Sequence, residues 1–283
     1  MMNLPNDIFE TGRRIIDCKT PKVMGILNST PDSFYDGGAF ALLDDALGRA
    51  GQIVNEGAEI IDIGGESTRP GSNRVSVSEE IARVVPIIER ICTEFDVAIS
   101  VDTSKAEVAS AAIEAGAEIV NDISGFTFDG DLPLVVSEAG CGVVLMHLRG
   151  TFASMHNTKS DTDIIEDVKR GLDKSVEIAL AAGIDKHKIC LDPGFGFSKT
   201  LAQTIELLRN LDEIIEYFRD FSILIGTSRK SFLAKLLENK PVDERLYGTI
   251  AVNTVAAIKG VRLFRVHDVQ ANVDALGVVS HLL

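Results

Sequence analysis

Three polar residues lie at the C-terminal ends of apolar runs, where buried strands would end. Asp102, Asn121 and Asp192 each follow such a run. A carboxylate in this position can accept paired hydrogen bonds from a heterocycle rich in N–H groups, and an amide can both donate and accept. Any one of the three could instead anchor a loop or cap a helix. Together they favour a site for a flat, polar ring.

Cationic side chains occupy the same kind of position behind other apolar runs. The chain carries 42 acidic against 28 basic residues, a formal charge of −14, so a local group of cations stands out against this background. Such a group indicates a phosphate or pyrophosphate site. Its members are Arg69, Arg229, Lys230, Arg265 and His267.

Other chemistries find no support in the sequence. It contains no G-x-S-x-G elbow, H-E-x-x-H pair, Walker A loop or G-x-G-x-x-G turn. His147 and His267 are candidates for an acid or a base, whereas His156, His187 and His281 are expected to be solvent-exposed.

These residues need a scaffold that brings their strand ends together. Eight apolar runs alternate with stretches of helical periodicity. Buried strands separated by helices indicate a parallel sheet, and eight such units predict a closed (β/α)₈ TIM barrel of the α/β class, with an open doubly wound sheet as the alternative. The runs span 23–27, 60–63, 98–101, 119–121, 142–146, 189–191, 223–225 and 263–266; the helical stretches span 42–55, 78–94, 107–115, 132–138, 162–182, 202–219, 245–258 and 273–282.

No Pro-, Gly- or Ser-rich linker divides the chain, so residues 21–283 are predicted to form one barrel domain. Residues 1–20 are expected to be a short N-terminal extension that caps it. They carry charges throughout and lack the apolar core of a signal peptide, which predicts a cytoplasmic protein.

Composition excludes two broad classes of protein. A sequence pI near 4.8 argues against a nucleic-acid binder, which needs a basic face. The apolar runs are far shorter than the roughly 20 residues of a membrane span, so no membrane segment is expected. The four cysteines lie far apart, and we expect them to be reduced and mostly buried, as Cys18, Cys92, Cys141 and Cys190.

Seven longer motifs, which contain most of these polar residues, closely resemble those of the dihydropteroate synthases, a family of pterin-binding enzymes. They occur in the order of that family from about residue 21 to the C-terminus. They are MGILNSTPDSF (24–34), DIGGESTRPG (62–71), ISVDTS (99–104), MHLRG (146–150), DPGFGF (192–197), GTSRKSF (226–232) and RVHD (265–268).

The resemblance implies a transferase of folate biosynthesis. It would join 4-aminobenzoate to 6-hydroxymethyl-7,8-dihydropterin pyrophosphate, giving 7,8-dihydropteroate and pyrophosphate, with Mg²⁺ as cofactor. By the same resemblance, the pterin would be bound by Asp102, Asn121, Met146, Asp192, Phe197, Gly226, Lys230 and Arg265. Pyrophosphate would be bound by Asn28, which also holds Mg²⁺, and by Thr68, Arg69, Arg265 and His267. The 4-aminobenzoate pocket would contain Phe34, Pro70, Lys230 and Ser231, and the residues expected to take part in catalysis are Lys230, Arg265, Asp36 and His267.

Two residues depart from the family pattern, and two other functions stay open. Ser29 replaces a small apolar residue and Phe152 a common proline, which bears on loop geometry more than on the reaction. The alternatives are a catalytically silent pterin-binding paralogue and a methyltetrahydrofolate–corrinoid methyltransferase. The resemblance also implies a homodimer formed through the later helices. The unaltered motif at 226–232 predicts that sulfonamides compete with 4-aminobenzoate.

Overall fold

The core of the protein is a closed barrel of parallel strands. The computed structural model describes residues 7–29, 39–69, 71–156 and 162–282. The strands are neighbours in the order β10-β3-β4-β5-β6-β7-β8-β9. The predicted (β/α)₈ barrel is confirmed, and the open sheet is wrong because β10 pairs with β3 and closes the ring. Their bounds are β3 Lys22–Asn28, β4 Ile60–Gly64, β5 Ala98–Asp102, β6 Ile119–Asp122, β7 Gly142–Met146, β8 Ile189–Asp192, β9 Ser222–Ile225 and β10 Leu263–Val266.

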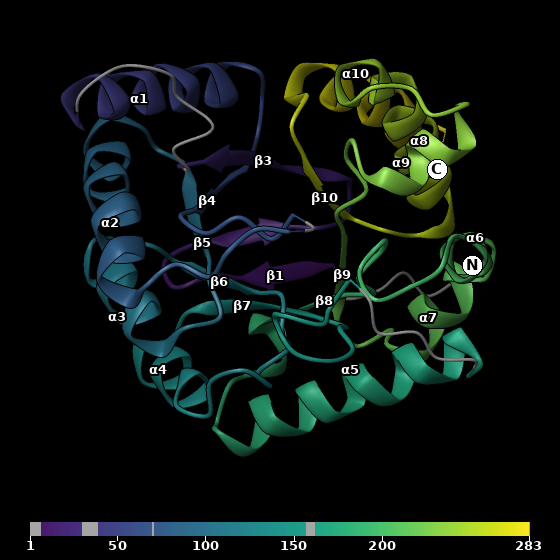
Figure 1. The fold of residues 1–283 in the computed structure, drawn as a ribbon, viewed down its shortest axis with the longest axis horizontal. Helices are drawn as coiled ribbons and strands as arrows, with labels where there is room; N and C mark the ends of the chain where they lie inside the picture. Colours follow the sequence, from purple (N-terminus) through teal and green to yellow (C-terminus); the bar gives the residue numbers. More distant parts are fainter. Residues whose placement is uncertain (1–6, 30–38, 70, 157–161, 283) are drawn as a thin grey trace.

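Helices surround this barrel (Figure 1). Their apolar faces and the outward side chains of the strands form one continuous buried cluster. The helices are α1 Ala39–Asn55, α2 Val77–Glu94, α3 Ala106–Glu114, α4 Leu132–Ala139, α5 Ile164–Ala181, α6 Leu201–Arg209, α7 Leu211–Tyr217, α8 Ser231–Leu236, α9 Leu246–Lys259 and α10 Val269–Ser280.

The single helix predicted over 202–219 is wrong. The segment forms α6 and α7, because Asn210 leaves the helical conformation at φ −105° and ψ 25°. Asparagine favours such breaks because its side chain competes with backbone hydrogen bonding. The short helix α8 and the 3₁₀ turns Lys186–Lys188 and Val242–Arg245 were not predicted, since their apolar periodicity is too brief to detect.

An N-terminal hairpin closes the amino-terminal end of the barrel. Strands β1 (Ile8–Glu10) and β2 (Ile15–Asp17) pair antiparallel. Phe9, fully buried, packs with residues from all eight barrel strands. The buried Glu118, just before β6, accepts a hydrogen bond from Thr11 Oγ1 at 2.7 Å and pairs with Arg14. The hairpin thus fills this end of the barrel, and the strand-end polar residues expected to form a site lie at the opposite, carboxyl end.

Three of the four cysteines are buried, as expected, but Cys92 is exposed. Helix α2 turns Val84, Ile88 and Ile91 toward the core. Cys92 follows Ile91 by one residue, about 100° around the helix, and therefore faces outward. No helix of the described segments is both long enough and apolar enough to cross a bilayer.

Candidate active site

The carboxyl ends of neighbouring strands place polar groups at one level of the rim. The strand register pairs Asn28 with Gly64, Gly64 with Asp102, and Asp102 with Asn121. Residues in register across parallel strands point to the same side of a sheet. Segments separated by more than 90 residues in sequence thus contribute to a single cluster.

Arg265 is the centre of that cluster. Its Nε lies 2.5 Å from Asp62 Oδ2, and one of its terminal nitrogens lies 2.7 Å from Asp102 Oδ2. The fully buried Asp62 also accepts hydrogen bonds from Asn121 Nδ2 at 3.1 Å and Ser100 Oγ at 2.6 Å. Asp62 therefore orients both Arg265 and Asn121. This role of Asp62 was not predicted, although a lone carboxylate inside an apolar run indicates a buried polar contact.

The charges in this cluster perturb one another. Burial raises the pKa of Asp102 to about 7, against the opposing effect of Arg265. Burial would lower the pKa of Arg265, but Asp62 and Asp102 outweigh it and raise that pKa above its ordinary value. Arg265 therefore stays charged between its two carboxylate partners.

A second group, around Asp192 and Lys230, lies next to Arg265 along the rim. Lys230 Nζ donates to the Phe195 carbonyl at 2.7 Å and lies 4.3 Å from the centre of the Phe197 ring. Gly226 leaves space here, because a Cβ on it would lie 3.8 Å from Arg265 Cβ and 3.9 Å from Asp192 Oδ2.

In this second group, burial favours the uncharged forms of both the Lys230 amine and the Asp192 carboxyl group. Burial lowers the pKa of Lys230 to about 8 and raises the pKa of Asp192, and the two charges partly offset these shifts. Met146, in register with Asp192, packs against Phe197 in a small apolar cluster beside them. The rim therefore has two polar edges, one around Arg265 and one around Asp192 and Lys230. Met146 and Phe197 form an apolar wall beside them.

A buried hydrogen-bond network holds the loop that carries Phe197. Lys199 Nζ donates to the Gly194 carbonyl at 2.8 Å and lies 3.0 Å from His147 Nδ1, and the other ring nitrogen of His147 faces Asp167 at 3.5 Å. Burial lowers the pKa of Lys199 to about 7 and that of His147 to about 4. His147 is thus a neutral support of the loop, buried away from the rim.

The predicted group of cations is only partly brought together. Arg229 makes a bidentate ion pair with Asp268, so it binds its neighbouring loop and is not free to bind a phosphate. His267 lies beside it, with Nδ1 3.0 Å from Ser228 Oγ. Burial, followed by the charges of Arg265 and Arg229, lowers the pKa of His267 to about 4, so this imidazole is neutral at pH 7.

The β4–α2 loop (residues 65–76) carries Thr68 and the exposed Arg69. Glu66 closes its base, since Glu66 Oε1 accepts from the backbone N–H of Val75 at 2.6 Å and from Lys105 Nζ at 2.8 Å. His156 Nε2 lies 2.8 Å from the Thr68 carbonyl. The expected exposure of His156 is wrong for this reason, while His187 and His281 are exposed as expected.

Of the residues expected to bind 4-aminobenzoate or to take part in catalysis, three lie outside the described residues and one is at the surface. Phe34, Asp36 and Pro70 lie outside the residues that the structure describes. Ser231 is exposed at the start of α8, directly after Lys230. Ser29, where the resemblance leads us to expect a small apolar residue, donates from Oγ to the Arg83 carbonyl at 3.2 Å, which ties the end of β3 to α2.

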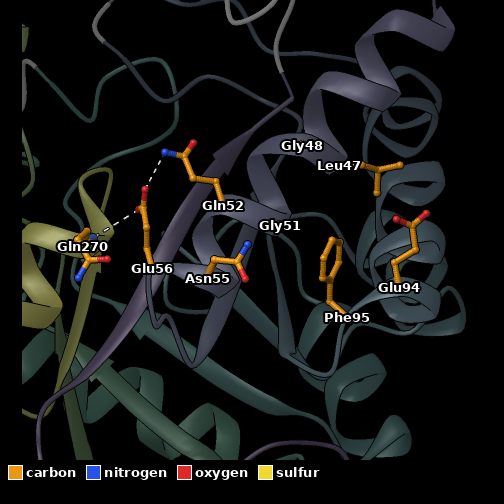
Figure 2. A pocket seen from close by; sticks show the side chains of 9 residues that line it. All are labelled: Leu47, Gly48, Gly51, Gln52, Asn55, Glu56, Glu94, Phe95 and Gln270. Atoms are coloured by element: carbon orange, nitrogen blue, oxygen red, sulfur yellow. Dashed lines mark hydrogen bonds between the residues drawn. The ribbon is translucent and has the colours of Figure 1, made fainter.

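A hollow of about 670 Å³ lies on the outer helical layer, away from this rim (Figure 2). It is lined by residues of α1 together with Glu94, Phe95 and Gln270. Its acidic Glu56 accepts from Gln52 Nε2 at 2.7 Å and from the backbone N–H of Gln270 at 3.4 Å. We assign no chemistry to it, because both of its acidic side chains are already paired, Glu56 with Arg49 and Glu94 with Arg90.

Comparison with known proteins gives a consistent result. Residues 24–267 match the family model described as pterin binding enzyme. A dihydropteroate synthase of Synechocystis is 44% identical over 275 residues, which cover 97% of this chain and 92% of that protein. The structure of the Yersinia pestis dihydropteroate synthase with a sulfonamide drug superposes with a TM-score of 0.90 at 42% identity, and that of the Xanthomonas albilineans enzyme with 4-aminobenzoic acid does so with 0.90 at 39%. These alignments cover 97% and 98% of this chain and 98% of each solved chain.

Proposed function

This chain belongs to the pterin-binding enzymes, among the dihydropteroate synthases, and from that membership we propose how its rim carries out their reaction. The reaction condenses 6-hydroxymethyl-7,8-dihydropterin pyrophosphate with 4-aminobenzoate and releases 7,8-dihydropteroate and pyrophosphate. The observation that carries the proposal is the cluster of Arg265 with Asp62 and Asp102, facing Asp192 and Lys230 across Gly226.

The pterin ring binds between these two polar edges. Asp102 and Asp192 accept hydrogen bonds from its ring and amino N–H groups, and the Asn121 amide can both donate to and accept from the ring. Met146 and Phe197 cover an apolar face of the ring. Arg265 and Lys230 border both the ring and its side chain, which places positive charge beside the departing group.

Pyrophosphate binds on the Arg265 side of the rim. Thr68 and Arg69 reach it from the β4–α2 loop, and the charge of Arg69 is near enough to contribute to the low pKa of His267. We assign the ring proton of the neutral His267 to Nε2, since Ser228 Oγ can donate to Nδ1 while accepting from the His267 backbone N–H at 3.1 Å. His267 is then a hydrogen-bond donor to a phosphate oxygen.

A magnesium ion fits the donor set at Asn28. Asn28 Oδ1 lies 3.9 Å from the place a Cβ on Gly64 would occupy, so this oxygen borders a space that glycine leaves open, whereas Asp102 Oδ2 there is already engaged by Arg265. Mg²⁺ commonly uses one or two protein oxygens together with water and substrate phosphates. When bound, it would neutralise charge on the leaving pyrophosphate.

We infer a dissociative reaction. The carbon–oxygen bond to pyrophosphate breaks with its electron pair on oxygen, and the positive charge on carbon is delocalised over the pterin. The amine nitrogen of 4-aminobenzoate then forms the new bond and loses its proton to water. Lys230 and Ser231 bind 4-aminobenzoate, with Phe34 and Pro70 proposed beside them and Asp36 proposed to stabilise the cation.

Measuring pyrophosphate release with Mg²⁺, with and without 4-aminobenzoate, tests this function. We expect release to rise with 4-aminobenzoate and to match dihydropteroate formed, and sulfonamides to raise the KM for 4-aminobenzoate without lowering kcat. Tight pterin binding with no turnover would instead indicate a silent paralogue. Methyl transfer from methyltetrahydrofolate would identify the alternative enzyme.

The pKa of Lys230 predicts an alkaline limit to activity. Because kcat/KM reports ionisations of the free enzyme, it should fall as pH rises through about 8, where Lys230 loses the proton that makes it cationic. Lys230→Arg stays charged at far higher pH, so its kcat/KM profile should lose this descending limb even if its maximum is lower. Lys240→Arg, at an exposed position, serves as the control and should leave the limb in place. An unchanged limb in Lys230→Arg would assign it to another group.

We propose that α9 forms a homodimer interface with a second copy of the chain. Tyr247, Val255 and Ile258 on this helix are exposed by 81, 52 and 58%, an unusual density of exposed apolar side chains on one element. Ile258→Glu should shift the protein from dimer to monomer in analytical ultracentrifugation. Leu134→Glu, at a 55% exposed position on α4, is the matched control and should not change the mass. A monomeric wild type would refute the proposal.

A further inference from the structure

Two side chains of the β7–α5 loop contact the β4–α2 loop, and the proposed function uses neither. His156 Nε2 lies 2.8 Å from the Thr68 carbonyl. A carbonyl only accepts, so Nε2 carries a hydrogen and donates it. The same imidazole stacks on Phe197, with ring centroids 5.8 Å apart and planes 27° apart. One residue thus contacts both the apolar wall and the loop that carries Arg69.

Phe152 makes the second contact. The guanidinium of Arg74, in the β4–α2 loop, lies 5.3 Å from the centre of the Phe152 ring. Phe152 also packs on the apolar cluster that contains Met146 and Met155. A side chain without an aromatic ring at this position would have no ring face to offer the guanidinium.

We propose that His156 and Phe152 are positioning residues that hold the β4–α2 loop against the apolar wall formed by Met146 and Phe197 and so form a brace. The inference rests on the proposed binding of pyrophosphate by Thr68 and Arg69. The base of the loop is already fixed by Glu66 and Lys105. His156 fixes the peptide of Thr68, which directly precedes Arg69. The brace therefore acts on the affinity for the pyrophosphate group, and the pterin ring is bound without it.

The test compares two ligands in calorimetry: the dihydropterin alcohol, and its pyrophosphate ester with Mg²⁺. His156→Phe keeps a ring against Phe197 but has no donor for the Thr68 carbonyl. We expect it to weaken ester binding about 5- to 10-fold, the loss of one hydrogen bond, and to leave alcohol binding unchanged. His156→Gln can still donate from its amide and should bind the ester nearly as wild type does. Phe152→Leu should weaken ester binding about 2- to 5-fold.

Arg69→Ala separates this inference from the proposed function. If Arg69→Ala weakens ester binding but His156→Phe does not, the brace is wrong and the pyrophosphate site stands. If neither variant weakens it, the proposed role of the β4–α2 loop is wrong. Equal weakening of alcohol and ester by His156→Phe would show that His156 acts only through Phe197, and would overturn the brace.

Discussion

Replacing Arg265 with methionine is expected to lower kcat/KM by about 10²- to 10³-fold, the usual effect of removing one preorganised donor from developing negative charge. Arg265 is held by Asp62 and Asp102 before substrate binds, so its charge needs no reorganisation during the reaction. Methionine keeps much of the stem and removes the guanidinium. The loss should be largest in kcat, where charge on the departing pyrophosphate develops.

Steady-state kinetics with both substrates measure this effect, and thermal unfolding shows whether the variant folds. Arg265→Lys retains a charge but not the planar fork that reaches two carboxylates, so it should recover only part of the activity. Arg209→Met, on the exposed end of α6, is the matched control and should behave as wild type. Near-full kcat/KM in a folded Arg265→Met protein would remove Arg265 from the mechanism.

Lys105→Met should lower the free energy of unfolding by about 3–5 kcal/mol, the cost of leaving buried charge unpaired. Lys105 Nζ lies 2.8 Å from Glu66 Oε1 and 2.5 Å from Glu80 Oε2. The side chains of these three residues are at most 9% exposed. Without the ammonium group, two carboxylates face each other with little access to water.

Urea unfolding of the wild type and the variant measures this difference. Glu80→Gln in the Lys105→Met background removes one of the unpaired charges and should recover part of the stability. Lys240→Met breaks an exposed pair with Glu244 and should cost no more than about 1 kcal/mol. A loss of that small size in Lys105→Met would mean that Glu66 and Glu80 become protonated or hydrated at little cost.

The barrel could be predicted from the sequence because the pattern that indicates it, an apolar run followed by a helical stretch, is local and repeats along the chain. The apolar runs at 142–146 and 263–266 coincide with β7 and β10, and the other strands differ from their predicted runs by one residue at one or both ends. Runs buried on both faces have one common explanation, a parallel sheet covered by helices. The break at Asn210 escaped prediction, since apolar spacing continues through it into α7.

The sequence indicated some of the residues in the cluster at the rim, but it did not distinguish between the two arginines. Asp102, Asn121 and Asp192 stand out because each ends an apolar run. Arg229 looked equivalent to Arg265, yet it pairs with Asp268 while Arg265 turns inward to Asp62 and Asp102. Both arginines were expected near strand ends, and only the packing of those ends shows which of them turns into the cluster.

The sequence alone determined the closed barrel, the family to which the chain belongs, and which polar residues stand at the carboxyl ends of the strands. These depend on periodicity and on motifs a few residues long, which neighbouring residues specify. The tertiary structure alone decided how Asp62 holds Arg265 and Asn121, which histidines are buried, and that His156 contacts Thr68. The contacts of Asp62 with Arg265 and Asn121, and of His156 with Thr68, join residues more than 50 positions apart, and hydrogen bonding at such separations is set by the folded chain.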